Sequence, residues 1–246
     1  MTTLVLGATG ATGRLVVKQL LDKQQPVKMI VRSVENLSIG IISHDLVSIT
    51  RASILDLNEQ ALIQHIKGCD SIVCCLGHNL TVKGIWGQPT RLVTEVMKRV
   101  CHAISSLNPA APIKLILMST TGFQDLKNRE TVSIPHRCIV ALLRLALPPH
   151  VDNEAAARFL QDNCSSKEGI IKWVGVRPDS LIDQLASTDY DLHPSPVYDP
   201  IFDARATSRV NVAHFMVELI SNPILWQHWQ GRFPVIYNSI KETKKG

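Results

Sequence analysis

Three glycines spaced three residues apart, Gly7, Gly10 and Gly13, form the segment whose residue types point most clearly to chemistry. They belong to the run GATGATG, whose other residues are small and include Thr9, Ala11 and Thr12. Glycine lets a chain turn tightly and lets its backbone approach a ligand. Because the run follows an apolar segment and precedes a helix-like pattern, its amides and the helix N-terminus are suited to a pyrophosphate. The run therefore predicts a dinucleotide site.

The second apolar run, 27–31, ends next to Arg32 and Ser33. An acidic residue at this position would hydrogen-bond a ribose 2′-hydroxyl and favour NAD. A guanidinium instead suits a 2′-phosphate, and a serine hydroxyl adds a donor. The alternative is that Arg32 is a solvated charge at a strand end. We predict NADP(H) as the cofactor.

Two further strand ends are expected to line the same groove. The third run is followed by Ser53 and Ile54, which we expect to flank the adenine. The fourth run continues into residues placed against the cofactor, namely Cys75, Leu76 and Gly77. His78 comes next and is a candidate for contact with the substrate, although a lone histidine can also be an ordinary loop residue. Trp86 lies in the following loop and is a candidate wall of the acceptor pocket or a packing residue.

The fifth run, 113–118, ends at Ser119 and Thr120, the candidate catalytic residues. A hydroxyl there can orient an acceptor and donate to developing negative charge without being the proton source. The alternative is that these hydroxyls satisfy local backbone groups.

Short apolar runs alternate with amphipathic stretches along the chain. The predicted strands are 3–6, 27–31, 46–49, 71–76, 113–118, 170–176 and 233–237, and the predicted helices are 13–24, 57–66, 90–106, 152–163 and 210–220. Asp56 and Glu59 match a capping box for the second helix. Residues 189–203 contain three prolines and are expected to be irregular. This alternation predicts an α/β fold with a doubly wound parallel sheet, whose ligands bind at the carboxyl ends of the strands.

The motifs together resemble the atypical short-chain dehydrogenase/reductase superfamily. They are GATGATG, Val31-Arg32-Ser33, Leu76-Gly77, 118–122 and Val176-Arg177-Pro178. The nearest branch is the NmrA-like NAD(P)H-binding group that includes biliverdin reductase B, also called flavin reductase. The resemblance implies one Rossmann-like domain over 1–246, with a cofactor part up to about 165 and a small C-terminal substrate-side part from about 166. It also implies that Pro178 closes over the nicotinamide.

Standard short-chain dehydrogenases use a tyrosine and lysine pair on the helix after the fifth strand, because a nearby cation lowers the pKa of the phenol. Residues 134–163 contain neither residue type, and the YxxxK match at 237–241 lies too near the C-terminus to replace them. Asn153 and Ser180 stand at positions where the biliverdin and flavin reductase branch has substrate-facing histidines. These two departures put a tetrapyrrole or a flavin in doubt as the natural substrate.

Two functions stay open from the resemblance. One is NADPH-dependent hydride transfer to a small conjugated acceptor, such as a quinone, a flavin or a similar carbonyl compound, with protonation from water. The other is a non-enzymatic NADP(H)-binding regulator or assembly factor with a protein partner. An epimerase or dehydratase fits less well, because those enzymes also need the tyrosine and lysine pair.

Composition fits an ordinary globular protein. The 246 residues are 45% hydrophobic and 19% charged, and the net charge of +5 is not clustered as in a nucleic-acid binder. Six cysteines without CxxC spacing predict reduced, buried thiols and no metal site. No secretory or membrane-spanning pattern is present, so we expect a cytoplasmic protein with a small-molecule acceptor and no membrane or nucleic-acid partner, as a monomer or small homo-oligomer.

Overall fold

A computed structural model gives the arrangement of most of the chain. It describes residues 1–78, 89–128, 130, 139–140, 142, 144, 147–165 and 169–239. Trp86 and Cys138 lie outside these residues, as does Lys241 of the YxxxK match.

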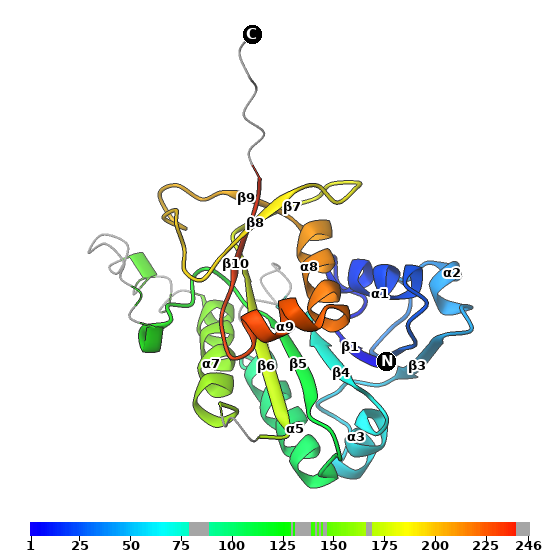
Figure 1. Ribbon diagram of the computed structural model, residues 1–246. Helices are drawn as coiled ribbons and strands as arrows, with labels where there is room; N and C mark the ends of the chain where they lie inside the picture. Colours follow the sequence, from blue (N-terminus) through cyan, green and yellow to red (C-terminus); the bar gives the residue numbers. More distant parts are fainter. Residues whose placement is uncertain are drawn as a thin grey trace.

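One eight-stranded sheet organises the chain, in the order β3-β2-β1-β4-β5-β6-β10-β8 (Figure 1). Its strands are β1 (Thr3–Leu6), β2 (Val27–Val31), β3 (Val47–Arg51), β4 (Ser71–Cys74), β5 (Ile113–Met118), β6 (Ile171–Pro178), β8 (Tyr190–His193) and β10 (Val235–Asn238). All neighbours pair in parallel except β10 with β8. A separate pair joins β7 (Ser180–Ile182) to β9 (Ala206–Ser208). The fold is therefore Rossmann-like, with an antiparallel strand at one edge of the sheet.

Helices cover both faces of the sheet. The helices are α1 (Gly13–Asp22), α2 (Ile39–Ile42), α3 (Glu59–Ile66), α5 (Leu92–Leu107), α7 (Pro148–Asn163), α8 (Arg209–Ser221) and α9 (Pro223–Trp229), with a short 3₁₀ turn, η1, at Leu126–Asn128. One face packs against α1, α8 and α9, and the other packs against α3, α5 and α7 (Figure 1). The molecule thus has three layers, and the carboxyl ends of its parallel strands share one edge.

Strand residues alternate between the two hydrophobic cores. In β1, Leu4 and Leu6 pack toward α3 and α5, whereas Val5 packs toward α1 and α8. In β4, Ile72 packs toward α3 and α5, whereas Val73 packs toward α1 and α8. Side chains of successive strand residues point to opposite faces, and strands covered on both faces become continuous apolar runs. This is why the sequence revealed these strands clearly.

Two local predictions were wrong. The capping residue of α3 is Asn58, whose Oδ1 accepts a hydrogen bond from the Ala61 amide at 2.8 Å, and not Asp56. Because the helix begins at Glu59, that residue lies one position after the cap and cannot complete the predicted box. Residues 189–203 are also not wholly irregular, since 190–193 form β8 against β10. Residues 190–193 form a strand because their backbone pairs with β10, although their sequence is polar and is followed by a proline.

The described cysteines agree with the prediction of reduced thiols. All are free and buried, namely Cys69, Cys74, Cys75, Cys101 and Cys164. Burial raises the pKa of Cys74 to about 12, which keeps this thiol protonated. No group of metal-ligating side chains occurs among the described residues, and no described helix is long and apolar enough to cross a membrane.

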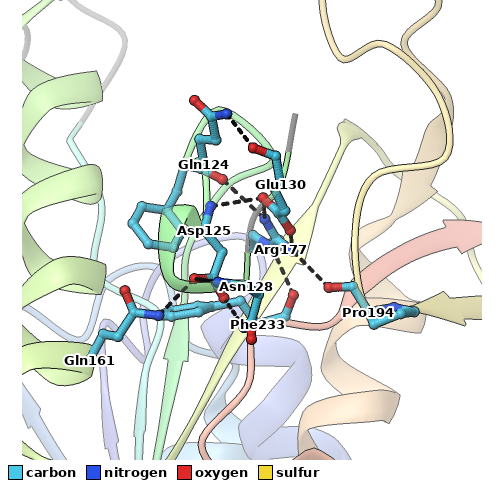
Figure 2. Close-up of polar contacts among 9 residues, drawn as sticks. Gln124, Asp125, Asn128, Glu130, Gln161, Arg177, Pro194 and Phe233 are labelled. Atoms are coloured by element: carbon cyan, nitrogen blue, oxygen red, sulfur yellow. Dashed lines mark hydrogen bonds and ion pairs between the residues drawn. The ribbon is translucent and has the colours of Figure 1, made fainter. Parts of the chain in front are cut away.

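A buried arginine and its ion pair hold the end of β6 against three segments, which follow β5, follow β8 and precede β10 (Figure 2). Arg177 is fully buried, and its guanidinium contacts both carboxylate oxygens of Glu130 at 2.6 and 2.9 Å. The same guanidinium donates to the carbonyls of Phe123, Phe233 and Pro194. Glu130 also accepts a hydrogen bond from the Asp125 amide. This network, which the sequence did not reveal, holds the segments after β5 and β8 against β6.

Candidate cofactor and substrate site

The glycine turn lies between β1 and α1, and it is packed too tightly for larger residues. Gly7 has φ +76°, and a Cβ there would lie 2.7 Å from the carbonyl carbon of Cys75. A Cβ on Gly13 would lie 2.1 Å from the Gly7 oxygen. The Gly10 amide donates to that oxygen at 3.0 Å and closes the turn. Gly7 and Gly13 therefore allow β1, β4 and α1 to meet closely.

The tip of the turn is open to a ligand. Gly10 and Ala11 are exposed, Thr9 is half-buried and Thr12 is buried. The first amides of a helix have no partner within that helix and carry partial positive charge. A phosphate group fits this environment because its oxygens accept from such amides. The turn thus has the features that a pyrophosphate requires.

Two arginines stand at the neighbouring strand ends. Arg32 and Ser33 follow β2 and are exposed, and the Ser33 hydroxyl accepts from the Glu35 amide at 3.2 Å. Arg51 ends β3 and is also exposed, with its backbone in register with Val31, the residue before Arg32. Within the described part of the chain, neither arginine forms an ion pair. Arg51 was missed from the sequence because the predicted third strand ended two residues early.

The segment after β3 is fixed by a single side chain from α5. Arg99 donates to the carbonyls of Ile54, Leu55 and Leu57. Ile54 is buried and Ser53 is half-buried. These contacts hold Ser53 and Ile54 at the carboxyl edge, where we expect the adenine.

The end of β4 leads into a buried histidine–carboxylate pair. Cys75 is buried under the glycine turn, Leu76 is half-buried and Gly77 is exposed. His78 Nε2 lies 2.8 Å from Asp152 Oδ2, and the two side chains are 4% and 0% exposed. Asp152 also accepts from the amides of Val93 and Thr94 at the start of α5. The sequence did not predict the role of Asp152, because this residue follows His78 by 74 residues. The resemblance indicated its neighbour Asn153 instead.

The hydroxyl residues after β5 have three different environments. Ser119 is buried, and its Oγ has no hydrogen-bond partner among the described residues. Thr120 is half-buried, and its Oγ1 accepts from the Gly122 amide at 3.2 Å. Thr121 donates to Asp179 Oδ1 at 3.1 Å. The turn is therefore anchored to the residue after Pro178, and the Thr120 hydroxyl retains its own proton for a further contact.

Helix α7 contributes a second histidine to this region. A Cβ on Gly122 would lie 2.4 Å from the His150 ring, so the ring packs directly on the turn after Thr120. His150 Nε2 lies 3.2 Å from Glu154 Oε1. Burial acts to raise the pKa of Glu154, but His150 and Arg144 outweigh it and lower the pKa. His150 was missed by the sequence analysis, although a histidine early in the helix after the fifth strand was a usable signal.

The other predicted substrate residues lie on separate elements. Pro178 is buried at the end of β6, and its carbonyl accepts from the Thr121 amide at 3.4 Å. Asn153 is half-buried on α7, whereas Ser180 is exposed at the start of β7. Trp86 lies outside the described residues. Helix α7 carries no tyrosine and no lysine, and Tyr237 lies on β10, two strands away from β5.

The donor set along this edge fits a dinucleotide. The tight glycine turn and the α1 N-terminus suit the pyrophosphate, and the exposed arginines after β2 and in β3 suit additional phosphate charge. The hydroxyls after β5 occupy the other end of the edge. In doubly wound sheets a ligand binds where strand order reverses, and here this is between β1 and β4.

Comparison with protein families agrees with this geometry. The model of a family described as NAD(P)H-binding matches residues 7–223, which is most of the chain. The chain belongs to this NAD(P)H-binding family. No curated protein sequence matches the chain.

Solved structures support the same fold. An oxidoreductase, ylbE from Lactococcus lactis, is 16% identical with a TM-score of 0.66, over 97% of this chain and 91% of that one. A short-chain dehydrogenase/reductase from Veillonella parvula in complex with NADP is 15% identical with a TM-score of 0.65, over 96% and 94%. ChuY, an anaerobillin reductase from Escherichia coli O157:H7, is 14% identical with a TM-score of 0.67, over 100% of both chains. The chain thus has the fold of atypical short-chain dehydrogenase/reductase proteins.

Proposed function

We propose that this protein is an NADPH-dependent reductase of small conjugated carbonyl compounds, with quinones as the first class to test. The observation that carries the proposal is Arg32 after β2, beside Arg51 at the end of β3, on the same edge as the glycine turn. Guanidinium groups bind phosphate through charge-assisted hydrogen bonds, and no carboxylate occupies the position that would favour NAD. Family membership supports the nicotinamide cofactor.

Different residues along the carboxyl edge of the sheet would bind different parts of the cofactor and the acceptor. The amides of Ala11, Thr12 and Gly13 and the two arginines bind the phosphates, because the Gly10 amide already donates to the Gly7 oxygen. Ser53 and Ile54 flank the adenine. When bound, NADPH supplies a hydride to the acceptor, which also takes up one proton from water. Thr120 donates a hydrogen bond to the acceptor oxygen as negative charge develops there. Asp152 fixes the His78 ring through Nε2, and Pro178 and Thr121 limit access of water.

Replacing Arg32 tests the cofactor preference. Arg32→Ala is expected to weaken NADPH binding relative to NADH by roughly 1–3 kcal/mol, since the lost contact is charge-assisted. Titration calorimetry with each nucleotide measures the ratio. Arg232→Ala removes an equal charge from an exposed position preceding β10 and is the matched control. An unchanged ratio in Arg32→Ala, or an equal change in the control, would contradict the assignment.

Replacing Thr120 tests whether its hydroxyl contributes to the reaction. Thr120→Ala is expected to lower kcat by about tenfold, or ~1.4 kcal/mol, while NADPH affinity stays nearly unchanged. Thr120→Ser keeps the hydroxyl and should retain most activity. Steady-state NADPH oxidation with a series of quinones gives kcat and KM for each variant. If Thr120→Ala lowered thermal stability but left kcat unchanged, the hydroxyl would only support the Gly122 turn.

A second candidate function is an NADP(H)-binding regulator, which the lack of a tyrosine and lysine pair on α7 favours. It predicts tight NADPH binding with no oxidation by any quinone or flavin. Cofactor-dependent capture of a protein partner, lost in Gly10→Asp, would support it. Measurable quinone-dependent NADPH oxidation would exclude it as the sole role.

A further inference from the structure

Two cysteine thiols meet between α5 and α7. Cys101 lies on α5, and Cys164 directly follows the last residue of α7. The Cys164 thiol donates a hydrogen bond to Cys101 Sγ at 3.6 Å, although the two residues are 63 positions apart in the chain. Strand β6 begins shortly after Cys164, so this thiol pair lies toward the amino ends of the parallel strands. It is therefore separate from the glycine turn and the other cofactor residues.

The other described cysteines are not arranged in this way. Cys74 and Cys75 are consecutive, but their side chains lie in the two different hydrophobic cores and point to opposite faces of the sheet. The Cys69 thiol donates to the carbonyl of His65 at 3.4 Å. No group of three or more metal-ligating side chains occurs in the described part of the chain, so a metal does not explain the thiol pair.

The geometry of the thiol pair is close to that of a disulfide. A disulfide bond is about 2.05 Å long, so the two sulfur atoms, now 3.6 Å apart, would have to approach by about 1.5 Å. Cys101 is held within α5, but Cys164 is the C-cap of α7, with φ −116° and ψ 15°. Helix ends open more readily than helix centres, so Cys164 can make most of this movement.

The two thiols differ in reactivity. Cys164 is 9% exposed, the largest value among the described cysteines, and the exposed Ser165 follows it. A hydrogen bond from the Cys101 thiol to the ionised form lowers the pKa of Cys164, although burial acts to raise it. The same hydrogen bond and burial both raise the pKa of Cys101. Since the thiolate is the nucleophile, Cys164 is the thiol that attacks an oxidant, and Cys101 stands ready to resolve the product.

We infer that Cys101 and Cys164 form a reversible disulfide between α5 and α7 when a hydroperoxide oxidises Cys164. The Cys164 sulfur attacks one oxygen of the hydroperoxide, the O–O bond breaks, and the other oxygen leaves with a proton as water or an alcohol. Cys164 then carries a sulfenic acid. The Cys101 sulfur attacks the Cys164 sulfur, the S–O bond breaks, and the hydroxide leaves as water with the thiol proton.

The two thiols thus give two electrons to the hydroperoxide, and a dithiol such as dithiothreitol restores them by exchange. The inference does not depend on the proposed reductase function.

The disulfide would join two helices that are already fastened elsewhere. Asp152, near the start of α7, accepts from the amides of Val93 and Thr94 at the start of α5. The new bond would link the same two helices near the end of α7. Because His150 of α7 packs on the turn at Gly122, the bond would also restrain the helix that supports the end of β5.

Peptide mapping of the full-length protein tests the inference directly. The protein is treated with hydrogen peroxide in molar excess, free thiols are alkylated, and the chain is cut with trypsin. Peptides 100–114 and 159–167 each contain one cysteine. They should appear as one linked species, lighter than the two separate peptides by two hydrogen atoms, and dithiothreitol should separate them. Absence of this species, or a disulfide of either residue with another cysteine, would overturn the inference.

Substitutions test the separate roles of the two thiols. Cys164→Ser should abolish the linked species. Cys101→Ser and Cys101→Ala should accumulate a sulfenic acid at Cys164, detected with dimedone, because the resolving thiol is absent. Cys69→Ser is the matched control, since it removes a buried thiol outside the pair, and it should leave the linked species unchanged. Dimedone labelling of a cysteine other than Cys164 in both Cys101 variants would contradict the assignment of the attacking thiol.

Thermal unfolding tests the link between the helices. Oxidation should raise Tm by roughly 4–16 °C, because the bond closes a long loop of the unfolded chain. The rise should be absent in Cys164→Ser and reversed by dithiothreitol. An unchanged or lower Tm of the cross-linked protein would show that the bond forces α5 and α7 out of their packing, against the geometry inferred for the pair.

Discussion

Glu130→Ala is expected to lower the free energy of unfolding by about 3–5 kcal/mol, the range measured when one partner of a buried ion pair is removed. Arg177 is fully buried, so its charge would lose its carboxylate partner without gaining access to water. The three backbone carbonyls that Arg177 also contacts cannot neutralise a full charge. Urea denaturation followed by circular dichroism measures the change.

A matched control comes from the surface of α1. Asp22→Ala breaks the ion pair with Lys18, whose side chains are 64% (Lys18) and 58% (Asp22) exposed, and should change stability by less than about 1 kcal/mol. Glu130→Gln keeps the shape and some hydrogen bonds, so its loss should fall between these two. Equal effects of Glu130→Ala and Asp22→Ala would show that Arg177 is stabilised without Glu130.

Gly13→Ala is the second substitution with a large expected effect, and it should act on both folding and cofactor binding. The added Cβ would lie 2.1 Å from the Gly7 oxygen, which is backbone and cannot rotate away. The turn and the start of α1 must then move apart, at a cost of roughly 1–3 kcal/mol in unfolding free energy. Since the displaced amides are those expected to bind the pyrophosphate, NADPH affinity should fall by at least about tenfold.

Gly40→Ala, on α2, is the control. Among the described residues no atom lies within 4 Å of a Cβ built on Gly40, so the free energy of unfolding should not fall in the same denaturation experiment. Calorimetric NADPH titration completes the comparison. A Gly13→Ala protein as stable as Gly40→Ala, with normal NADPH binding, would contradict the role assigned to the close approach of Gly13 and Gly7.

The strands β1, β2 and β5 were predictable from sequence because both of their faces are buried. The predicted bounds of β1, β2 and β5 match the observed ones, since the apolar residues of each strand end where the chain leaves the sheet. The family match over 7–223 bears out the resemblance drawn from the glycine run. The individual cofactor residues, including Arg32 and Pro178, remain predictions.

The polar pairs were not predictable, because their partners are distant in the chain. His78 lies 74 residues from Asp152, and Glu130 lies 47 residues from Arg177. Nothing in either local sequence specifies which charged residue of another element lies opposite. Strand β8 was not predictable either, because its sequence YDLH is too short and too polar to indicate a strand before its pairing with β10 is known.

The position of β10 between β6 and β8 has a consequence for how the chain matures during synthesis. Among the described strands, β8 pairs with β10 alone, yet it leaves the ribosome more than forty residues earlier. Domains generally fold as units during synthesis. The far edge of the sheet cannot close until residues 235–238 are available. A nascent chain stalled before β10 would therefore leave β6 with an unpaired edge, at which a strand of another chain could pair.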